Sequence, residues 1–104
     1  MPGIDFQLLR ERIAMRDVLR LLQFEATVRR GEQWRGPCPV HGSRNPLSRS
    51  FSVNVQLGRY KCFDCGTHGH ALELWSAVHG VNLHAAAVTL CPLLGLEIPW
   101  VTRW

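Results

Sequence analysis

Two short metal-ligand motifs constrain the fold of this chain more than any other feature. In residues 38–41 (CPVH) and 62–65 (CFDC), two ligand-type side chains are separated by two residues. In a tight turn this spacing points both side chains at one centre, and two such knuckles supply the four tetrahedral ligands of structural zinc. Gly42 and Gly66 directly follow the knuckles, which suits a chain leaving a turn with a positive φ. The sequence therefore predicts one structural Zn²⁺, bound by Cys38, His41, Cys62 and Cys65.

Other roles for the cysteines and histidines fit the pattern less well. Cys62 and Cys65 have thioredoxin-type spacing, but that motif opens a helix inside a βαβ unit, which this sequence does not show. A disulfide framework is disfavoured because Cys91 lies in an apolar helical stretch, where a buried free thiol is common. Four protein ligands also leave no open position for a catalytic water. The remaining histidines of the central region are spare ligands or, as we expect, surface and capping residues: His68, His70 and His79.

Length and charge limit the possible classes of protein. The 104 residues form a single domain (1–104) with a modest core, so bound zinc would supply much of the folding free energy. The net charge is +4, and all basic residues except Lys61 are arginines, which favours phosphate or carboxylate partners. No apolar run approaches the roughly 20 residues of a membrane span, and the N-terminus has no signal-peptide core. We expect a cytoplasmic protein with no membrane partner.

Hydrophobic periodicity divides the chain into a helical part, a ribbon, a second helical part and a tail. These parts are residues 4–24, 26–66, 69–94 and 95–104. The first part has apolar residues at three- and four-residue spacings, with a break into two helices expected between residues 14 and 17. We therefore expect an α+β fold, in which a small antiparallel zinc-ribbon sheet is flanked by N-terminal and C-terminal helices.

Within the ribbon, the change to a two-residue period indicates strands. Residues 26–36 predict a hairpin that turns at Gly31-Glu32 and leads into the first knuckle. A polar loop follows over 43–50. The alternation of apolar and polar residues over 51–56 is typical of a strand with one solvent-exposed face. Residues 59–62 then return towards the second knuckle.

The helix ends carry capping signals. Asp5 and Asn82 are suitable N-caps, and Gly80 and Gly95 are suitable residues for ending a helix. Pro92 should kink or weaken the last helix because its ring displaces a backbone hydrogen bond. The two C-terminal helices are expected over residues 70–79 and 82–94.

Basic and aromatic side chains are interleaved at two places in the ribbon. Trp34 precedes Arg35, and Tyr60 lies between Arg59 and Lys61, which share one face of a strand. Proteins that bind single strands combine basic groups along the backbone with rings on which bases stack. The candidate nucleic-acid-binding residues are Arg29, Arg30, Trp34, Arg35, Arg59, Tyr60 and Lys61.

The aromatic residues also have a purely structural interpretation. We expect Phe51 to pack in the ribbon core, whereas Tyr60 and Phe63 suit the core and the surface equally well. At the end of the chain, Trp100 and Trp104 form either a contact surface or a frayed end.

The motifs CPVHG, SFSV and YKCFDCGTHGHALEL, followed by GLEIP, resemble the N-terminal zinc-binding domain of bacterial DNA primases. That domain is a Cys-His-Cys-Cys zinc ribbon, and the resemblance runs from about Ile4 to Pro99. The sequence departs from the family at residues 45–51 (NPLSRSF), where a shorter Thr-Pro-Ser-Phe run is usual. Asp64 stands where Gly is common, and His70 where Asn or Asp is common.

The resemblance implies a module that binds single-stranded DNA template in primer initiation during DNA replication. In primases a polymerase domain with a metal-binding carboxylate cluster follows, whereas only Glu73 and Glu97 follow the second knuckle here. We therefore expect no primer synthesis by this chain alone, and a separately encoded primase, polymerase or helicase is a candidate partner. The alternatives are a protein-interaction adaptor with no direct nucleic-acid role and a gene fragment with no independent role.

Overall fold

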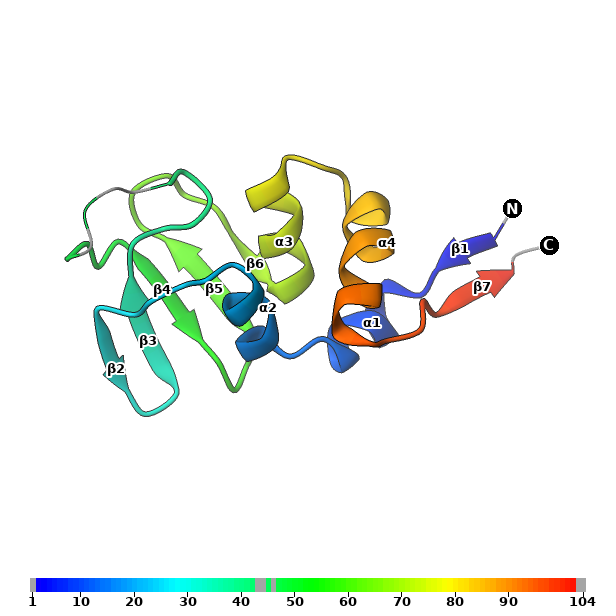
Figure 1. Cartoon of the computed structure of the whole chain (residues 1–104), viewed down its shortest axis with the longest axis horizontal. Coiled ribbons are helices and arrows are strands. Elements are labelled where there is room, and N and C mark those ends of the chain that lie inside the picture. Colours follow the sequence, from blue (N-terminus) through cyan, green and yellow to red (C-terminus); the bar gives the residue numbers. More distant parts are fainter. Residues whose placement is uncertain (1, 43–44, 46, 103–104) are drawn as a thin grey trace.

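The structure is a computed structural model that describes residues 2–42, 45 and 47–102. The described residues form a five-stranded antiparallel sheet, four helices and a two-stranded ribbon. These three parts lie one after another along the long axis of the molecule (Figure 1). The fold is α+β, as the sequence predicts.

The N-terminal segment forms one strand of the two-stranded ribbon, followed by two short helices. It comprises β1 (Pro2–Ile4), α1 (Phe6–Arg12) and α2 (Met15–Leu21). The Asp5 side chain accepts a hydrogen bond of 3.0 Å from the Leu8 N–H, which confirms the predicted N-cap. The two helices separate at Ile13 and Ala14, at the start of the interval expected from the sequence.

The sheet contains one strand that the sequence did not predict. Its strands, in spatial as well as sequence order, are β2 (Val28–Arg30), β3 (Gln33–Gly36), β4 (Phe51–Asn54), β5 (Arg59–Cys62) and β6 (His68–His70). The hairpin turning at Gly31-Glu32 and the strand pair over residues 51–62 are confirmed. Strand β6 has the sequence HGH, which is too short and too polar to show alternation, and it forms because β5 offers it a free edge.

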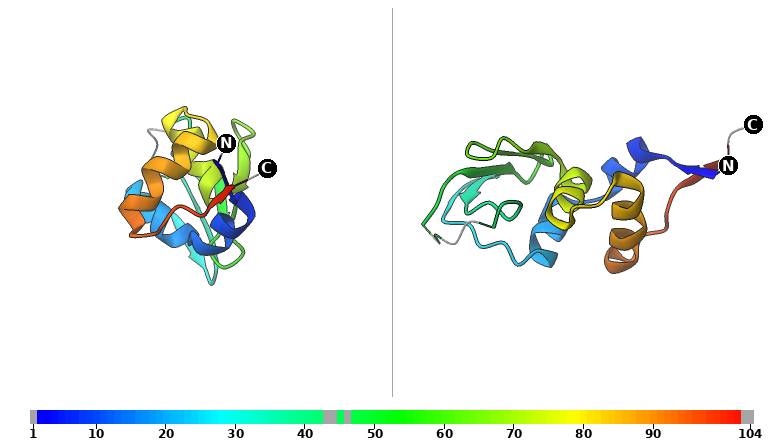
Figure 2. Two further views of the ribbon diagram at one scale, coloured as in Figure 1. Left: turned by 90° about the vertical axis from the view of Figure 1, so that its right-hand side faces the viewer. Right: turned by 90° about the horizontal axis from the view of Figure 1, so that it is seen from above.

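One face of the sheet is packed against helices. Phe51, Val53 and Tyr60 are each at most 4% exposed on this covered face. The Phe51 ring stacks on Tyr60 at a centroid distance of 5.6 Å and meets Phe24 at 5.3 Å. Helices α2 and α3 lie between the sheet and the α1–α4 layer (Figure 2). A single hydrophobic cluster joins the sheet to all four helices.

The C-terminal helices begin and end where the capping signals predict. They are α3 (Ala71–His79) and α4 (Leu83–Leu94). The Asn82 side chain accepts a 2.8 Å hydrogen bond from the Ala85 N–H, and the helices stop at Gly80 and Gly95. Pro92 lies in the last turn of α4, which continues past it for two residues. Cys91 is buried and free, as expected.

Residues 100–102 of the tail pair with the start of the chain. Strand β7 (Trp100–Thr102) runs antiparallel to β1, with Gly3 opposite Val101. This ribbon projects from the end of an elongated molecule whose extents are 49 × 26 × 20 Å (Figure 2). Trp100 is 50% exposed, and Trp104 lies outside the described residues. No single described helix is long and apolar enough to span a membrane; α3 and α4 meet that criterion only as a pair, bent by 106°.

Candidate metal centre and nucleic-acid interface

The four predicted ligand side chains converge at the end of the sheet. Cys38 and His41 follow β3, Cys62 ends β5, and Cys65 lies in the turn before β6. Their ligand atoms all lie within 4.8 Å of one another. The Cys38 and Cys65 sulfurs are 3.9 Å apart, and the Cys62 sulfur is 3.7 Å from His41 Nδ1. A tetrahedron with zinc–sulfur bonds of about 2.3 Å has edges of about 3.8 Å, so the donor set fits zinc.

Local backbone geometry explains why each knuckle is followed by glycine. Gly42 and Gly66 have φ values of 66° and 79°, in the left-handed region that other residues rarely adopt. In the second knuckle, the Gly66 N–H donates to the Cys62 carbonyl at 3.0 Å. The Cys65 N–H donates to the Cys62 sulfur at 3.4 Å. These bonds hold the knuckle in a shape that directs both sulfurs to one centre.

The protonation of the thiols is set by burial and by backbone donors. Burial raises the pKa of Cys38 to about 12. For Cys62, burial also acts to raise the pKa, but hydrogen bonds from the N–H groups of Cys65 and Asp64 and from the Cys65 and Cys38 thiols together outweigh it and lower the pKa to about 7. Zinc binds thiolates, so loading the site would release protons from these thiols.

His41 is held between the cluster and a carboxylate. Its Nδ1 faces the Cys62 sulfur, whereas its Nε2 lies 3.5 Å from Asp64 Oδ2. The imidazole would therefore bind metal through Nδ1 while Asp64 orients the ring from the opposite side. Asp64 stands where glycine is common in the resembled family.

The histidines outside the knuckles lie away from the metal-ligand group. His70 is at the N-cap position of α3, with its Nδ1 3.8 Å from Glu73 Oε1. His79, at the end of α3, packs on Trp75 at a centroid distance of 4.2 Å. His68 is exposed on β6. The positions of His68 and His79 agree with surface roles, whereas the His70 side chain forms no capping hydrogen bond.

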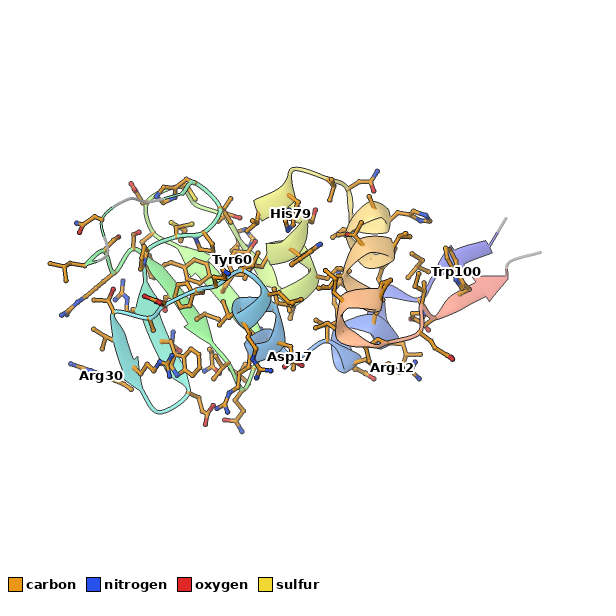
Figure 3. All side chains as sticks on the ribbon, in the orientation of Figure 1. Arg12, Asp17, Arg30, Tyr60, His79 and Trp100 are labelled. Carbon is orange, nitrogen blue, oxygen red and sulfur yellow. The ribbon has the colours of Figure 1, made fainter. Side chains whose placement is uncertain are left out.

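The strand register divides the sheet residues between two faces. The face opposite the helices, here called the open face, contains Val28, Arg30, Gln33, Arg35, Ser52, Asn54, Arg59, Lys61, His68 and His70. Four of the predicted nucleic-acid-binding residues therefore share one surface: Arg30, Arg35, Arg59 and Lys61. Figure 3 shows Arg30 at the outer edge of the sheet.

Two other predicted residues lie on the opposite side of the sheet. Arg29 and Trp34 are paired across β2 and β3 on the covered face. The Arg29 guanidinium lies 4.3 Å from the Trp34 ring centroid, and that of Arg16 lies 5.7 Å from it. These three side chains form a separate cation–π cluster at the sheet edge, rather than a part of the open face.

Of the two roles that the sequence left open for Tyr60, the structure shows the one in the core. Its ring is 4% exposed and packs on Phe51, and its hydroxyl bonds to the Thr67 hydroxyl at 3.0 Å. Burial raises the pKa of Tyr60. Because Tyr60 alternates with Arg59 and Lys61, the strand that exposes those two cations must bury the ring between them.

An exposed aromatic residue next to the open face is Phe63. Its ring is 62% exposed, with the guanidinium of Arg35 at 5.2 Å and the ammonium of Lys61 at 5.3 Å. The open face also forms a shallow cavity of about 600 Å³, bordered by neutral polar side chains that include Gln33, Ser52 and Asn54. The alternation of polar and apolar residues in the sequence predicts that Ser52 and Asn54 face solvent. The position of Gln33 beside them follows only from the register between β3 and β4.

Comparisons with known proteins agree with this architecture. The CHC2 zinc finger model, named for the zinc ribbon of DnaG, matches residues 4–103. The DNA primase of Treponema pallidum is 37% identical over 70 residues, which are 67% of this chain and 11% of the relative. The DNA primase of Lactococcus lactis is 36% identical over 76 residues, 73% of this chain and 12% of the relative.

A solved structure shares the fold as well. The crystal structure of the zinc-binding and RNA polymerase domains of Aquifex aeolicus primase superposes with a TM-score of 0.72 at 28% identity. The match covers 92% of this chain and 23% of that chain. Because the family model covers nearly the whole sequence and a solved relative repeats the fold, the chain belongs to the CHC2 zinc-finger family of primase zinc ribbons.

Proposed function

We propose that this chain is a zinc-dependent module that binds single-stranded DNA across the open face of its sheet. One observation carries the proposal. The open face presents four cations, Arg30, Arg35, Arg59 and Lys61, and its ten residues include no carboxylate. The exposed ring of Phe63 borders it. Cations that follow a phosphate backbone, beside a ring that stacks on bases, are what binding of a single strand requires.

In this proposal one zinc ion has a structural role. Cys38, His41, Cys62 and Cys65 would bind it, with no position left for a catalytic water. The metal would fix the loop after β3 to the turn after β5. The Phe63 N–H already donates to the Ser50 carbonyl at 2.8 Å across that junction. Zinc would therefore hold Phe63 in place next to Arg35 and Lys61.

The relatives supply the biological setting of the proposal. They are DNA primases, of which the chain spans 11% and 12%. We propose that the module reads single-stranded template during primer initiation in DNA replication. A separately encoded primase, polymerase or helicase would provide the catalytic or unwinding activity.

The proposal is tested by titrating zinc-loaded protein with single-stranded and duplex oligonucleotides of equal length at two salt concentrations. We expect tighter binding to the single strand and loss of binding on chelation. The variant Arg59→Ala with Lys61→Ala should weaken binding and reduce the salt slope by about 1.4, because each phosphate contact to a single strand contributes about 0.7. Its zinc content should not change, because neither side chain is a ligand.

A matched control removes the same charge elsewhere. Arg12 and Arg20 are exposed on α1 and α2, away from the open face, so Arg12→Ala with Arg20→Ala should retain binding. Equal, weak binding to both oligonucleotides, with no difference between the two variants, would argue against the open face. It would favour the adaptor alternative, for which the half-exposed Trp100 is one of several exposed apolar contacts.

A further inference from the structure

Three arginines line a small cavity at the outer edge of the open face. The cavity has a volume of about 310 Å³ and is bordered by Val28, Arg30, Gln33, Arg35 and Arg49. We call the group Arg30, Arg35 and Arg49 the arginine pocket. We propose that the arginine pocket binds a phosphate group of the nucleic acid. This inference rests on the proposed function, and it states where on the surface one phosphate group of the nucleic acid binds.

The arginine pocket is held together before any ligand arrives. The Arg35 Nε–H donates to the Arg49 carbonyl at 2.9 Å, which leaves four of the five N–H donors of that guanidinium for a ligand. The Thr27 hydroxyl donates to the Ser48 carbonyl at 3.0 Å. These two bonds tie the segment that carries Arg49 to the β2–β3 hairpin, so the backbone of the third arginine is held next to the other two.

The described carboxylates do not neutralise the charges in this pocket. No arginine of the pocket forms an ion pair with a described carboxylate. Elsewhere the described arginines that have such partners pair as Arg10–Glu73, Arg16–Glu32 and Arg20–Asp17. Like charges around one cavity repel each other, and an anion between them turns this repulsion into attraction. Guanidinium groups bind phosphate and carboxylate oxygens through pairs of parallel N–H bonds, and phosphate is the one of these two anions that a nucleic acid carries.

The pocket is continuous with the surface proposed to bind bases. The Arg35 guanidinium carbon lies 5.2 Å from the Phe63 ring centroid, so Arg35 separates the ring from the pocket. Gln33 borders both this pocket and the larger cavity of the open face. A strand with one base on Phe63 would therefore bring a neighbouring phosphate to the arginine pocket. That phosphate is either an internal diester or a terminal monoester.

Inorganic pyrophosphate is the direct probe of the site. We would titrate it into zinc-loaded protein and follow backbone amides and the Arg35 Nε–H by NMR. We expect shifts centred on the arginine pocket. Arg30→Gln with Arg49→Gln should weaken pyrophosphate binding at least about tenfold, since it removes two charged hydrogen-bond donors from the anion. The control, Arg12→Gln with Arg20→Gln, should bind as wild type. Equal weakening in both variants, or an unmoved Arg35 Nε–H, would overturn the proposal.

Oligonucleotides identify the source of the phosphate. Single strands with a 5′-hydroxyl or a 5′-phosphate would be titrated into wild type and the pocket variant. If the pocket takes a terminal monoester, the 5′-phosphate should strengthen binding to wild type only. If it takes an internal diester, the pocket variant should lose affinity equally for both strands.

The same titrations separate failure of this inference from failure of the proposed function. Arg59→Ala with Lys61→Ala should lose DNA affinity and retain pyrophosphate binding. If that variant behaves so but the pocket variant binds both ligands as wild type, the phosphate assignment is wrong and the DNA-binding face stands. If no single strand binds while pyrophosphate still depends on Arg30 and Arg49, the proposed function is wrong and the phosphate site stands.

Discussion

His41 and Asp64 show how one side chain can adjust a metal ligand. A carboxylate 3.5 Å from the Nε2 of His41 can orient the ring so that Nδ1 faces the Cys62 sulfur. We predict that Asp64→Asn lowers zinc affinity by about tenfold or more. Competition with a colorimetric chelator measures this directly. Asp17→Asn, which removes a half-buried carboxylate on α2, serves as the control, and equal zinc affinities in both variants would show that Asp64 does not act on the ligand.

Two phenylalanines next to the metal-ligand group should have opposite effects when truncated. Phe63 is 62% exposed and Phe51 is fully buried. Phe63→Ala should weaken binding of single-stranded DNA by about 1–3 kcal/mol, the contribution of one stacked base, with little change in Tm. Phe51→Ala should lower the free energy of unfolding by about 3–5 kcal/mol. Thermal melts and DNA titrations of both variants measure the two effects. A loss of stability in Phe63→Ala as large as that in Phe51→Ala would place its ring in the core.

At the level of residues, spacing predicted the metal-ligand group and alternation predicted part of the surface. The two-residue gaps predicted that Cys38, His41, Cys62 and Cys65 come together, because a tight turn points the two ligand side chains of each knuckle in the same direction. Alternation placed Arg59 and Lys61 on one face, but the burial of Tyr60 depends on which face meets the helices. That choice is made by packing between elements distant in the sequence, which no local pattern contains.

The ribbon of β1 and β7 is an element that local sequence could not predict. Each strand has three residues, and their stability depends on pairing between the two ends of the chain. The start of α1, the start of α4 and the ends of α3 and α4, in contrast, were predicted to within about a residue, because Asp5, Asn82, Gly80 and Gly95 act on their own neighbours. Helix ends that are set by capping residues can be predicted from the sequence. Short strands that form only by pairing with a distant segment cannot.

Removal of β7 tests whether this ribbon contributes to function. Deleting residues 100–104 removes three cross-strand pairs, each contributing about 0.2–1 kcal/mol, and uncovers the buried Ile4. We expect Tm to fall by several degrees while zinc content and DNA binding stay unchanged, because the ribbon projects from the end of the molecule opposite the sheet (Figure 1). Calorimetry and DNA titration of the truncated chain check this. Loss of DNA affinity in a folded truncated chain would mean that the ribbon contacts the strand.

For the whole molecule, the position of the metal-ligand group at the margin of one core predicts cooperative loss of structure without zinc. Cys38 and Cys62 belong to the same hydrophobic cluster as Leu72 of α3 and Leu90 of α4. Structural zinc contributes about 10–16 kcal/mol in zinc-finger peptides, comparable to the whole stability of a small domain, about 5–15 kcal/mol.

We therefore expect chelation to unfold the helices together with the sheet, although no helix supplies a ligand. Far-UV circular dichroism during titration with EDTA should show helical signal and zinc lost in parallel, and added zinc should restore both. A chelated chain that keeps its helical signal and still melts cooperatively would show that the helices fold independently of the ribbon. The open face would then lose its order, and with it DNA binding, while the core between the helices remained intact.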